Sequence, residues 1–559
     1  MSYMKLTGAQ IVVECLKKEG VKIIFGIPGG VIMPVYDVFY QEPSIKHILT
    51  KHEQGAAHAA DGYARATGNV GVCIATSGPG ATNLVTGLAN AYLDSIPLVA
   101  FTGQVPTNLI GTDAFQEVDI NGITLPITKN NYVVREVRDL ASIIQEAFYI
   151  ARTGRPGPVL IDLPRDIQLA QTEFKYPEKV SLNGYKPTFS GHIQQIKAAA
   201  QEISKAKRPV IYAGGGVISS NASSELRDLA FQANIPVTTT LMGIGTFPET
   251  HPLSLGMLGM HGTAYANYAI SAADLIIALG ARFDDRVTGK LSEFGSQAKI
   301  IHIDIDPAEI GKNVLVDIPI VGDLKKVLKK INEIIDKKEN TEWLETIKDW
   351  KRKYPLKYEN NQELKPQYII EEVYKISEGK AVIVTDVGQH QMWAAQYYQY
   401  TMPRTFISSG GLGTMGYGLP AAIGAKIGCP DKTVICISGD GSFQMNLQEL
   451  ATAINNHLTI MVIIMNNSYL GMVRQWQEFF FNKRYSSTAL TGNPDFVKLI
   501  EAYGGTGIRV NKKQELSPAL EKALSLNKFV LIDCIIPGEE NVFPMVIPGS
   551  PIDQMIGVD

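Results

Sequence analysis

Two short polar motifs lie one strand–helix–strand unit apart in the last third of the chain. Gly439-Asp440-Gly441-Ser442 follows the apolar run 433–438, and Asn466-Asn467-Ser468-Tyr469 follows the apolar run 459–465. Both runs read as buried strands, and the spacing of apolar residues predicts a helix from 444 to 456 between them. Loops that leave the carboxyl ends of neighbouring parallel strands meet at one edge of a sheet, where ligands bind in open α/β folds.

These motifs offer the oxygen ligands that a hard cation prefers. Asp440 can give a carboxylate oxygen, Asn467 an amide oxygen and Tyr469 its main-chain carbonyl, which together with phosphate oxygens would suit Mg²⁺. The glycines beside Asp440 allow the main chain to approach phosphates. Taken singly, Gly-Asp-Gly is also typical of a tight turn and Asn-Asn of a helix cap. Their occurrence together in one unit favours a metal and diphosphate site.

Further candidates stand at other strand ends. Gln389 and His390 follow the apolar run 381–385, and the glycine-rich segment 408–424 opens a predicted helix, an arrangement that suits an anion. Glu53 lies between a predicted strand at 45–52 and a predicted helix. A glutamate there commonly serves only to stabilise the helix dipole.

The elements that position these residues follow an α/β pattern. Short runs of Val, Ile and Leu alternate with longer amphipathic stretches and glycine turns, which is typical of parallel sheets buried on both faces. Examples of the runs predicted as strands are 21–24, 71–76, 98–102, 159–162, 209–213, 274–279, 299–304, 381–385, 433–438 and 459–465.

Two stretches interrupt this pattern and divide the chain into domains. Residues 172–190 are aperiodic and read as a linker, and 336–366 reads as a charged surface helix followed by a connection. We therefore expect three doubly wound parallel-sheet domains. Their expected bounds are 1–175, 190–340 and 365–540, followed by a tail, 541–559, that wraps over a neighbour.

Composition narrows the class of protein. With 559 residues the chain is too long for one core, and with 45% hydrophobic and 19% charged residues it is typical of a globular protein. A net charge of -3 gives no indication of nucleic acid or a membrane as a partner. The five cysteines show no metal-binding spacing, which favours a reducing compartment. Residues 1–10 carry no targeting pattern and no apolar run is long enough to span a bilayer, so we expect a cytoplasmic protein.

The paired motifs at 439–442 and 466–469 resemble the signature of thiamine diphosphate enzymes, and 52–65 resembles their pyrimidine-binding segment. The similarity runs nearly end to end with the catalytic large subunits of the acetohydroxyacid synthase (acetolactate synthase) family. It implies a pyrimidine-binding first domain, a central FAD-binding domain and a third domain that binds thiamine diphosphate and Mg²⁺. It also implies that the Glu53 carboxyl meets N1′ of the aminopyrimidine, so that the 4′-amino group can remove the thiazolium C2 proton.

The resemblance assigns residues to each site. It implies catalytic roles for Glu53, Gln116 and Gly30, and metal ligation by Asp440, Asn467 and Tyr469. The thiamine diphosphate contacts that it implies are Glu53, Gln389, His390, Gly413, Met415, Gly439, Gly441, Ser442 and Asn467. Since the family's site forms between two subunits, it implies a homodimer or a higher homo-oligomer, and the biosynthetic members commonly pair with a small regulatory subunit.

The central third contains no strict Gly-x-Gly-x-x-Gly fingerprint, so spacing alone does not establish a dinucleotide there. The run Arg282-Phe-Asp284-Asp285-Arg286 is similar to the family's flavin-binding stretch, although such a charged run is usually a solvated turn. The FAD contacts that the resemblance implies are Arg155, Gly214, Gly215, Gly216, Thr240, Leu241, Met242, His261, Gly262, Gly280, Arg282, Asp284, Arg286, Asp304 and Asp323. In the family this FAD is structural and does no net redox work.

The acceptor site is also assigned by resemblance. It implies that Arg286 holds the carboxylate of a second 2-oxo acid, for which a guanidinium is suited, and that Trp476 favours 2-oxobutyrate over pyruvate. Phe115 and Met472 are the other implied substrate contacts. None of the nine histidines adjoins another, whereas related decarboxylases use a histidine pair as proton donor. Arg165 stands where the family often has lysine, which keeps the charge.

These features predict a biosynthetic acetolactate synthase. It would decarboxylate pyruvate and join the hydroxyethyl enamine to a second pyruvate or to 2-oxobutyrate, giving 2-acetolactate or 2-aceto-2-hydroxybutyrate for branched-chain amino acid synthesis. The alternatives are a catabolic acetolactate synthase without FAD and a pyruvate oxidase whose flavin accepts electrons. A protein of another class, which keeps the fold for binding or regulation, is disfavoured by the presence of Glu53, Asp440 and Asn467.

Overall fold

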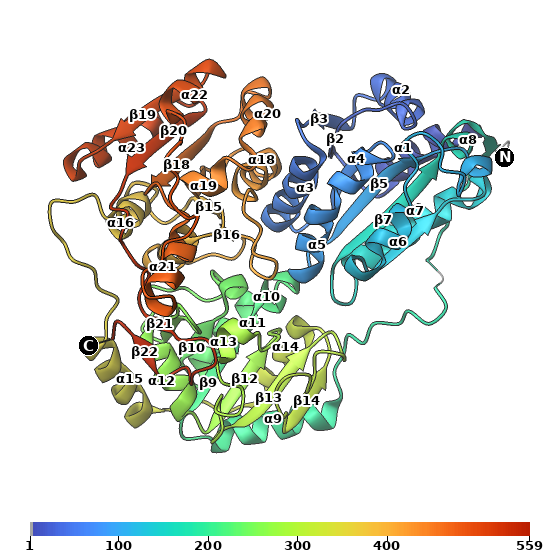
Figure 1. The fold of residues 1–559 in the computed structure, drawn as a ribbon. Coiled ribbons are helices and arrows are strands. Elements are labelled where there is room, and N and C mark those ends of the chain that lie inside the picture. Colours follow the sequence, from blue (N-terminus) through green and yellow to red (C-terminus); the bar gives the residue numbers. More distant parts are fainter. Residues whose placement is uncertain (1–3, 181, 559) are drawn as a thin grey trace.

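The computed structural model describes residues 4–180 and 182–558, so residues 1–3 of the segment 1–10, in which no targeting pattern is expected, lie outside the described residues. Three six-stranded parallel sheets, each with helices on both faces, make up the body of the chain (Figure 1). The predicted α/β class with three doubly wound sheets is confirmed. Each apolar run predicted as a strand contributes to a strand of one of these sheets.

The first and third sheets share one topology. The first has the order β3-β2-β4-β5-β7-β6 and the third the order β16-β15-β17-β18-β20-β19. The first comprises β2 (Ile23–Gly26), β3 (Lys46–Leu49), β4 (Gly71–Ala75), β5 (Leu98–Gln104), β6 (Asn130–Val133) and β7 (Pro158–Pro164). The third comprises β15 (Val382–Thr385), β16 (Phe406–Ile407), β17 (Val434–Gly439), β18 (Ile460–Asn466), β19 (Thr506–Val510) and β20 (Val530–Ile535). In sheets of this kind ligands bind where the strand order reverses, which is between β2 and β4 in the first sheet and between β15 and β17 in the third.

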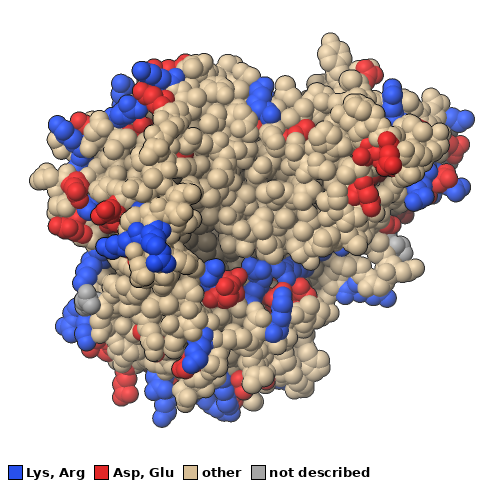
Figure 2. All heavy atoms as spheres, viewed as in Figure 1, with Lys and Arg blue, Asp and Glu red and all other residues tan. Residues whose placement is uncertain are grey.

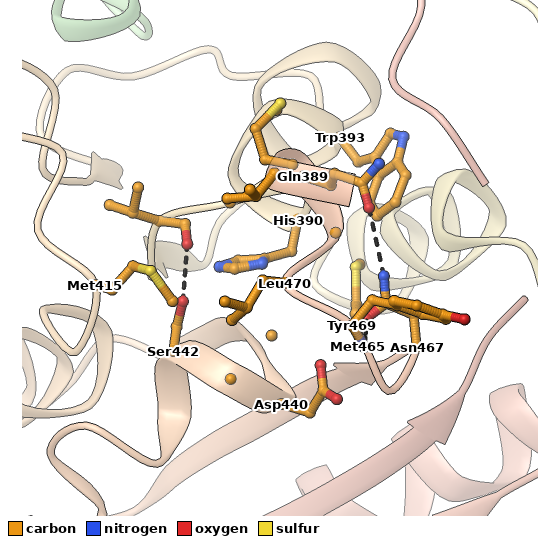
Figure 3. A pocket seen from close by; sticks show the side chains of 17 residues that line it. Gln389, His390, Trp393, Met415, Asp440, Ser442, Met465, Asn467, Tyr469 and Leu470 are labelled. Atoms are coloured by element: carbon orange, nitrogen blue, oxygen red, sulfur yellow. Dashed lines mark hydrogen bonds between the residues drawn. The ribbon is translucent and has the colours of Figure 1, made fainter. Parts of the chain in front are cut away.

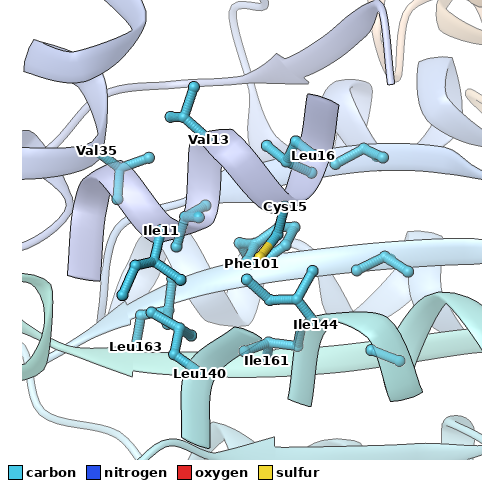
Figure 4. Close-up of a cluster of buried hydrophobic side chains, with 14 of the residues drawn as sticks. Ile11, Val13, Cys15, Leu16, Val35, Phe101, Leu140, Ile144, Ile161 and Leu163 are labelled. Carbon is cyan, nitrogen blue, oxygen red and sulfur yellow. The ribbon is translucent and has the colours of Figure 1, made fainter. Parts of the chain in front are cut away.

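The core of the first domain shows why its sequence alternates as it does. Helices α1 (Gly8–Lys18) and α7 (Leu140–Arg152) pack on one face of the sheet. Ile11 and Cys15 of α1 meet Phe101 of β5 and Ile144 of α7 in a fully apolar cluster (Figure 4). Helical spacing on α1 and α7 brings their apolar faces onto the sheet, and burial of these side chains drives the packing.

The central sheet has the order β11-β10-β9-β12-β13-β14. In chain order its strands are β9 (Pro209–Ala213), β10 (Val237–Thr239), β11 (Ser254–Met257), β12 (Leu275–Leu279), β13 (Lys299–Asp304) and β14 (Ile318–Val321). This is the strand order of dinucleotide-binding folds, in which the ligand crosses the sheet edge between the first and fourth strands, here β9 and β12.

Helix α3 (Glu53–Thr67) of the first domain packs closely on α18 (Gly418–Gly428) of the third. Glycines make this crossing possible: a Cβ at Gly62 would lie 2.2 Å from the carbonyl oxygen of Ala421, and one at Gly424 would lie 1.8 Å from that of Ala59. A buried ion pair flanks the crossing, in which Arg65 contacts Asp61 at 2.6 Å and Asp94 at 2.7 Å. The glycine contacts fix the third domain against the helix that begins with Glu53, and the ion pairs brace that helix within the first domain.

The structure corrects several sequence predictions. The helix predicted from 444 to 456 is absent as a continuous element: one turn of helix, α19 (Asp440–Phe443), is followed by a 3₁₀ turn, η5 (Leu447–Glu449), and a short helix, α20 (Leu450–Asn455). The segment predicted as a linker begins with a strand, β8 (Gln171–Glu173), that pairs with β1 (Lys5–Thr7). Apolar spacing in 444–456 fits both arrangements, and only tertiary contacts decide between them.

The other irregular segments also take defined places. The charged stretch contains α15 (Thr341–Lys353), whose Trp343 and Ile347 are buried. The tail packs on the central domain of its own chain, where the Val546 N–H donates to the carbonyl of Met260 at 2.8 Å. Two short strands of the tail, β21 (Met545–Val546) and β22 (Met555–Ile556), pair with each other. The neighbour that the tail covers here is therefore a domain of the same chain.

The distribution of charged and apolar side chains agrees with the near-zero net charge and mixed composition of the chain. Acidic and basic side chains are both scattered over the face shown in Figure 2, and basic ones gather where the lower, central domain meets the two upper domains. All five cysteines are free. Among the described residues, no helix combines the length and apolar character needed to span a bilayer.

Candidate active site

The motifs Gly439–Ser442 and Asn466–Tyr469 meet at one edge of the third sheet. Strands β17 and β18 are adjacent and parallel, with Gly439 opposite Met465, so Asp440 and Asn467 leave the sheet side by side. Both line one pocket together with Tyr469, Gln389 and His390 (Figure 3). The whole lining of this pocket comes from residues 387–473.

Asp440 is a buried carboxyl, 1% exposed, in the lining of this pocket. Burial raises its pKa to about 6, and Asn493 donates a hydrogen bond of 2.6 Å from Nδ2 to Oδ2. Asn467 accepts a 3.0 Å hydrogen bond from the N–H of Tyr469, which folds the loop around it. In the described part of the chain, no group of three His, Cys, Asp or Glu side chains comes together as a metal site. A cation at Asp440 would therefore need amide, carbonyl and cofactor oxygens, which suits Mg²⁺.

The other side of the pocket fits an anion. His390 is buried, burial lowers its pKa to about 3, and its Nε2 has no hydrogen-bond partner within the protein. A neutral imidazole can present one N–H donor to a phosphate oxygen. A Cβ at Gly439 would lie 2.8 Å from His390 Nδ1, so glycine is required for this approach. Gly441 and Ser442 line the same wall, and Ser442 Oγ donates to the carbonyl of Val387 at 2.8 Å.

Gln389 joins the metal loop to the rest of the domain. Its Nε2 donates to Oε1 of Gln475 and to the carbonyl of Glu540, both at 2.9 Å, and its Oε1 accepts from Asn467 Nδ2 at 3.4 Å. Gln389 begins α17 (Gln389–Tyr397), and Gln475 lies on α21 (Gly471–Phe480). Sequence reasoning missed Gln475 because a helical glutamine carries no distinguishing signal.

Met415 lines the pocket from the loop before α18. Asp386 holds this loop: its carboxylate accepts from the main-chain N–H of Gly416 at 2.8 Å and of Gly418 at 3.2 Å. Burial raises the pKa of Asp386 to about 6. Gly413 has a positive φ of 69°, which favours glycine. Asp386 was visible in the sequence as a polar residue directly after a strand, but no role was predicted for it.

Glu53 is the first residue of α3, as the sequence indicated, and lies apart from the pocket of Asp440. Its Oε2 accepts a 2.9 Å hydrogen bond from Nδ2 of Asn83. Its Oε1 faces Gly80, where a Cβ would approach to 3.4 Å. Asn83 ends α4 (Pro79–Asn83), a short helix after β4, and was not predicted. Within one chain, therefore, Glu53 is oriented but is absent from the lining of the pocket at 387–473.

Gly30 and Gln116 also follow strands of the first sheet and so belong to the edge at which Glu53 stands. Gly30 lies in the loop after β2. A Cβ added there would have no neighbour within 4 Å. Gln116, in the loop after β5, has a positive φ of 60°. A Cβ added at Gly78 would lie 3.0 Å from the Cα of Gln116, so the two loops are in contact. Phe115 beside it is 87% exposed, so this predicted substrate contact has no cover from its own chain.

The predicted acceptor residues come together from two domains. Arg286, on α13 (Asp285–Thr288) of the central domain, lies over the ring of Trp476 on α21. Trp476 lines a second cavity of about 600 Å³, and Met472 and Val473 line both this cavity and the pocket of Asp440. The two cavities therefore adjoin along α21.

The predicted FAD residues cluster at the carboxyl edge of the central sheet. Gly214, Gly215 and Gly216 follow β9, and a Cβ at Gly216 would lie 2.6 Å from Cα of Gly280, which follows β12. This close approach at the crevice between β9 and β12 requires glycine. The Oγ1 of Thr239, at the end of β10, is buried without a partner. These observations fit a dinucleotide at this edge.

Several residues of this set have partners within the protein. Thr240 caps η4 (Leu241–Gly243), Asp284 caps α13, and Asp323 caps α14 (Leu324–Ile334). Met242 packs against Gly410 of the third domain. A Cβ added at Gly410 would lie 2.4 Å from the sulfur of Met242.

Three further predicted residues of this set also contact other residues of the chain. His261 lies 3.3 Å from the carbonyl of Pro544 in the tail, and Gly262 closes a tight turn against the carbonyl of Met257. Arg282 pairs with Asp284 at 3.7 Å.

Arg155 bridges two domains. Its guanidinium contacts Glu309 at 2.6 Å and Asp306 at 3.4 Å, and its Nε donates to Ser95 at 2.7 Å. Burial raises the pKa of nearby Asp304 to about 6. Arg155 thus faces the sheet edge at which Asp304 ends β13.

Comparison with known proteins assigns the three sheets to family domains. The "Thiamine pyrophosphate enzyme" models match as the N-terminal TPP binding domain over residues 6–123, the central domain over 196–331 and the C-terminal TPP binding domain over 386–534. The chain is 53% identical to an acetolactate synthase large subunit of Cyanidium caldarium, over 99% of this chain and 97% of the relative. It is 48% identical to acetolactate synthase isozyme 3 large subunit of Escherichia coli, over 98% of each chain.

Proposed function

This chain belongs to the acetolactate synthase large subunits of the thiamine pyrophosphate enzymes, and we propose that it catalyses the biosynthetic reaction of that family. It decarboxylates pyruvate and ligates the remaining two-carbon unit to a second pyruvate or to 2-oxobutyrate. The products are 2-acetolactate and 2-aceto-2-hydroxybutyrate.

One observation carries the proposal: the pocket of Asp440 and the cavity of Trp476 adjoin along α21. The first cavity fits a metal-bound diphosphate, and the second has Arg286 beside its aromatic wall. A guanidinium next to an apolar surface suits a small oxo acid, with charge for the carboxylate and an apolar contact for the alkyl group. An enzyme that joins two oxo acids needs such an acceptor site beside its cofactor.

Thiamine diphosphate, when bound, supplies the carbanion that attacks the carbonyl of each oxo acid. Asp440, Asn467 and the Tyr469 carbonyl would hold Mg²⁺ on the diphosphate. Gln389, His390, Gly439, Gly441 and Ser442 would contact the diphosphate itself, as supported by the unpartnered Nε2 of His390. Met415 and the main chain at Gly413 would support the aminopyrimidine.

Glu53 would hold a proton for the aminopyrimidine. Asn83 occupies Oε2 of Glu53 and leaves Oε1 free to exchange the proton with a ring nitrogen. Since Glu53 is absent from the lining of its own chain's pocket, we propose that a second copy supplies it, in a homodimer or a larger homo-oligomer. Gln116, Gly30 and Phe115 would reach the same partner site from the first sheet.

FAD would bind at the carboxyl edge of the central sheet and act structurally. The close glycine approach between β9 and β12 supports this assignment, together with the buried unpartnered Thr239 hydroxyl. We further propose a small regulatory subunit as a partner, because the relatives are named as large subunits.

The test is a pyruvate ligation assay with thiamine diphosphate and Mg²⁺, with and without FAD. Acetolactate formation that falls when FAD is removed, without oxygen uptake or acetyl phosphate, is the expected result. Full activity after FAD removal would instead indicate a catabolic enzyme. Oxygen consumption with pyruvate would indicate an oxidase.

A further inference from the structure

Glu449 of the third domain reaches the turn that precedes Glu53 in the first domain. Its Oε1 accepts hydrogen bonds from the main-chain N–H groups of Lys51 and His52, both at 3.0 Å. Its Oε2 accepts one of 2.6 Å from the Thr452 hydroxyl. Glu449 is 0% exposed. Its partners at 51 and 52 lie 398 and 397 residues away in the sequence.

The first turn of α3 is shaped to receive this carboxylate. A Cβ at Gly55 would lie 2.4 Å from Oε1 of Glu449, so any side chain there would displace it. His52 caps the helix by accepting from the N–H of Gln54 at 3.1 Å. The residues on both sides of Glu53 are therefore held by hydrogen bonds. Glu449 holds the N–H groups of Lys51 and His52, and the His52 side chain holds that of Gln54.

We propose that Glu449 is a positioning residue for Glu53, and that it fixes the main chain from which the Glu53 carboxyl meets the aminopyrimidine. The inference rests on the proposed function, in which Glu53 exchanges a proton with the cofactor. A displacement of about 1 Å in a reacting group can reduce a rate on the order of 10²-fold. The two hydrogen bonds to 51 and 52 oppose such a displacement.

This contact also links two active sites of the proposed dimer. The segment 440–449 begins with Asp440, which lines the pocket of its own domain, and ends with Glu449. Through Glu449 the same segment orients the Glu53 that serves the partner's cofactor.

The roles of geometry and charge can be separated by substitution. One carbonyl oxygen has two lone pairs and can accept both N–H groups, so Glu449→Gln keeps the acceptor, and its amide can donate to the Thr452 hydroxyl. Glu449→Ala removes the acceptor. Gly55→Ala keeps Glu449 but pushes it away from the turn.

The readout is deuterium exchange at the thiazolium C2 of thiamine diphosphate bound to the Mg²⁺-loaded enzyme, measured by NMR without pyruvate. We expect Glu449→Ala and Gly55→Ala to slow exchange by about tenfold or more. Glu449→Gln should remain within about threefold of the wild type, because it keeps both hydrogen bonds. Affinity for thiamine diphosphate, followed by fluorescence, should be unchanged because the pocket residues are intact.

Glu249→Ala is the matched control. Glu249 also crosses a domain boundary and accepts a main-chain hydrogen bond, from Tyr400 at 2.7 Å, but it does not touch α3. It should lower the melting temperature as Glu449→Ala does and leave exchange unchanged. In the double variant Gly55→Ala/Glu449→Ala the two effects should not add, because the alanine at 55 then has no carboxylate to displace.

Exchange at the wild-type rate in Glu449→Ala would overturn the inference, and so would equal slowing in Glu449→Gln and Glu449→Ala. A wild-type enzyme that shows no C2 exchange would count against the proposed function instead.

Discussion

The guanidinium carbon of Arg286 lies 5.7 Å from the centroid of the Trp476 ring, so the central domain contacts the third at a side chain that lines the cavity beside the cofactor pocket. Trp476 and Met472 are one helical turn apart on α21 and therefore share a face. A cation over the face of an indole ring is attracted by about 0.5–1 kcal/mol at an exposed site. This pair defines the wall that the second oxo acid would meet.

Replacing Trp476 with leucine should reduce the preference for 2-oxobutyrate over pyruvate. One methylene in an apolar contact contributes about 1–3 kcal/mol, so the ratio of the two products should fall roughly tenfold or more. The measurement is a competition assay with both oxo acids present. Trp350→Leu, on α15 and remote from this cavity, should leave the ratio unchanged, and an unaltered ratio in Trp476→Leu would remove Trp476 from the acceptor site.

Arg286→Gln should weaken binding of the second oxo acid. A hydrogen bond to a charged group contributes about 1.5–3 kcal/mol, so the KM for the acceptor should rise by about tenfold. Steady-state kinetics at saturating cofactor measures this change. Arg352→Gln is a suitable control because Arg352 is 82% exposed and pairs only with Asp349 among the described ion pairs. An unchanged KM in Arg286→Gln would show that the carboxylate is held elsewhere.

Asp440→Asn should abolish stabilisation by Mg²⁺ and thiamine diphosphate while leaving the apoprotein folded. The amide of asparagine has the size of the carboxyl, and its oxygen can still accept the hydrogen bond from Asn493. Wild-type protein should melt at a higher temperature with ligands than without, since ligands that bind the native state stabilise it. A full ligand-dependent shift in the variant would contradict the assignment of Asp440.

Glu53→Gln should leave folding intact and lower turnover by roughly 10²–10⁴-fold. The amide oxygen of the new side chain can still accept from Asn83, so the local structure is kept. Circular dichroism and acetolactate assays test the two halves of this prediction. Glu14→Gln, at a surface pair with Lys17, should behave as wild type. Acetolactate formation near the wild-type rate in Glu53→Gln would refute the role of Glu53.

Glu249 should make the folded protein less stable as the pH rises. Burial raises the pKa of Glu249 from 4.5 to about 8, so between these values the folded carboxyl keeps a proton that the unfolded chain has lost. Folding then takes up a proton, and the free energy of unfolding falls with pH by up to about 1.4 kcal/mol per unit. Thermal unfolding from pH 5 to 8 should show a weaker decline in Glu249→Gln. Identical profiles would place the titration elsewhere.

Sequence predicted the strands that are local apolar runs, whereas short or polar strands such as β6 (Asn130–Val133), β10 (Val237–Thr239) and β16 (Phe406–Ile407) were not among the runs named. Strands 209–213 and 299–304 were predicted with the observed bounds, and the loops of Asp440 and Asn467 meet because β17 and β18 are neighbours in both sequence and space. The helix predicted at 444–456 is α-helical only from Leu450 to Asn455, after a 3₁₀ turn at Leu447–Glu449, because apolar spacing fits several local conformations. Glu449, at the end of that turn, accepts hydrogen bonds from the first domain.

The sequence by itself determined the α/β class, the three sheets and the types of residue at their strand ends, because these depend on periodicity and on motifs within one strand–helix–strand unit. Tertiary structure alone decided which side chains meet across domains. Asn83 on Glu53, Glu449 on the turn before it, Arg286 over Trp476 and the tail against His261 all join segments that no local pattern relates. Such contacts depend on how the packed domains place side chains, and this is set by the interlocking of whole surfaces rather than by spacing along the chain.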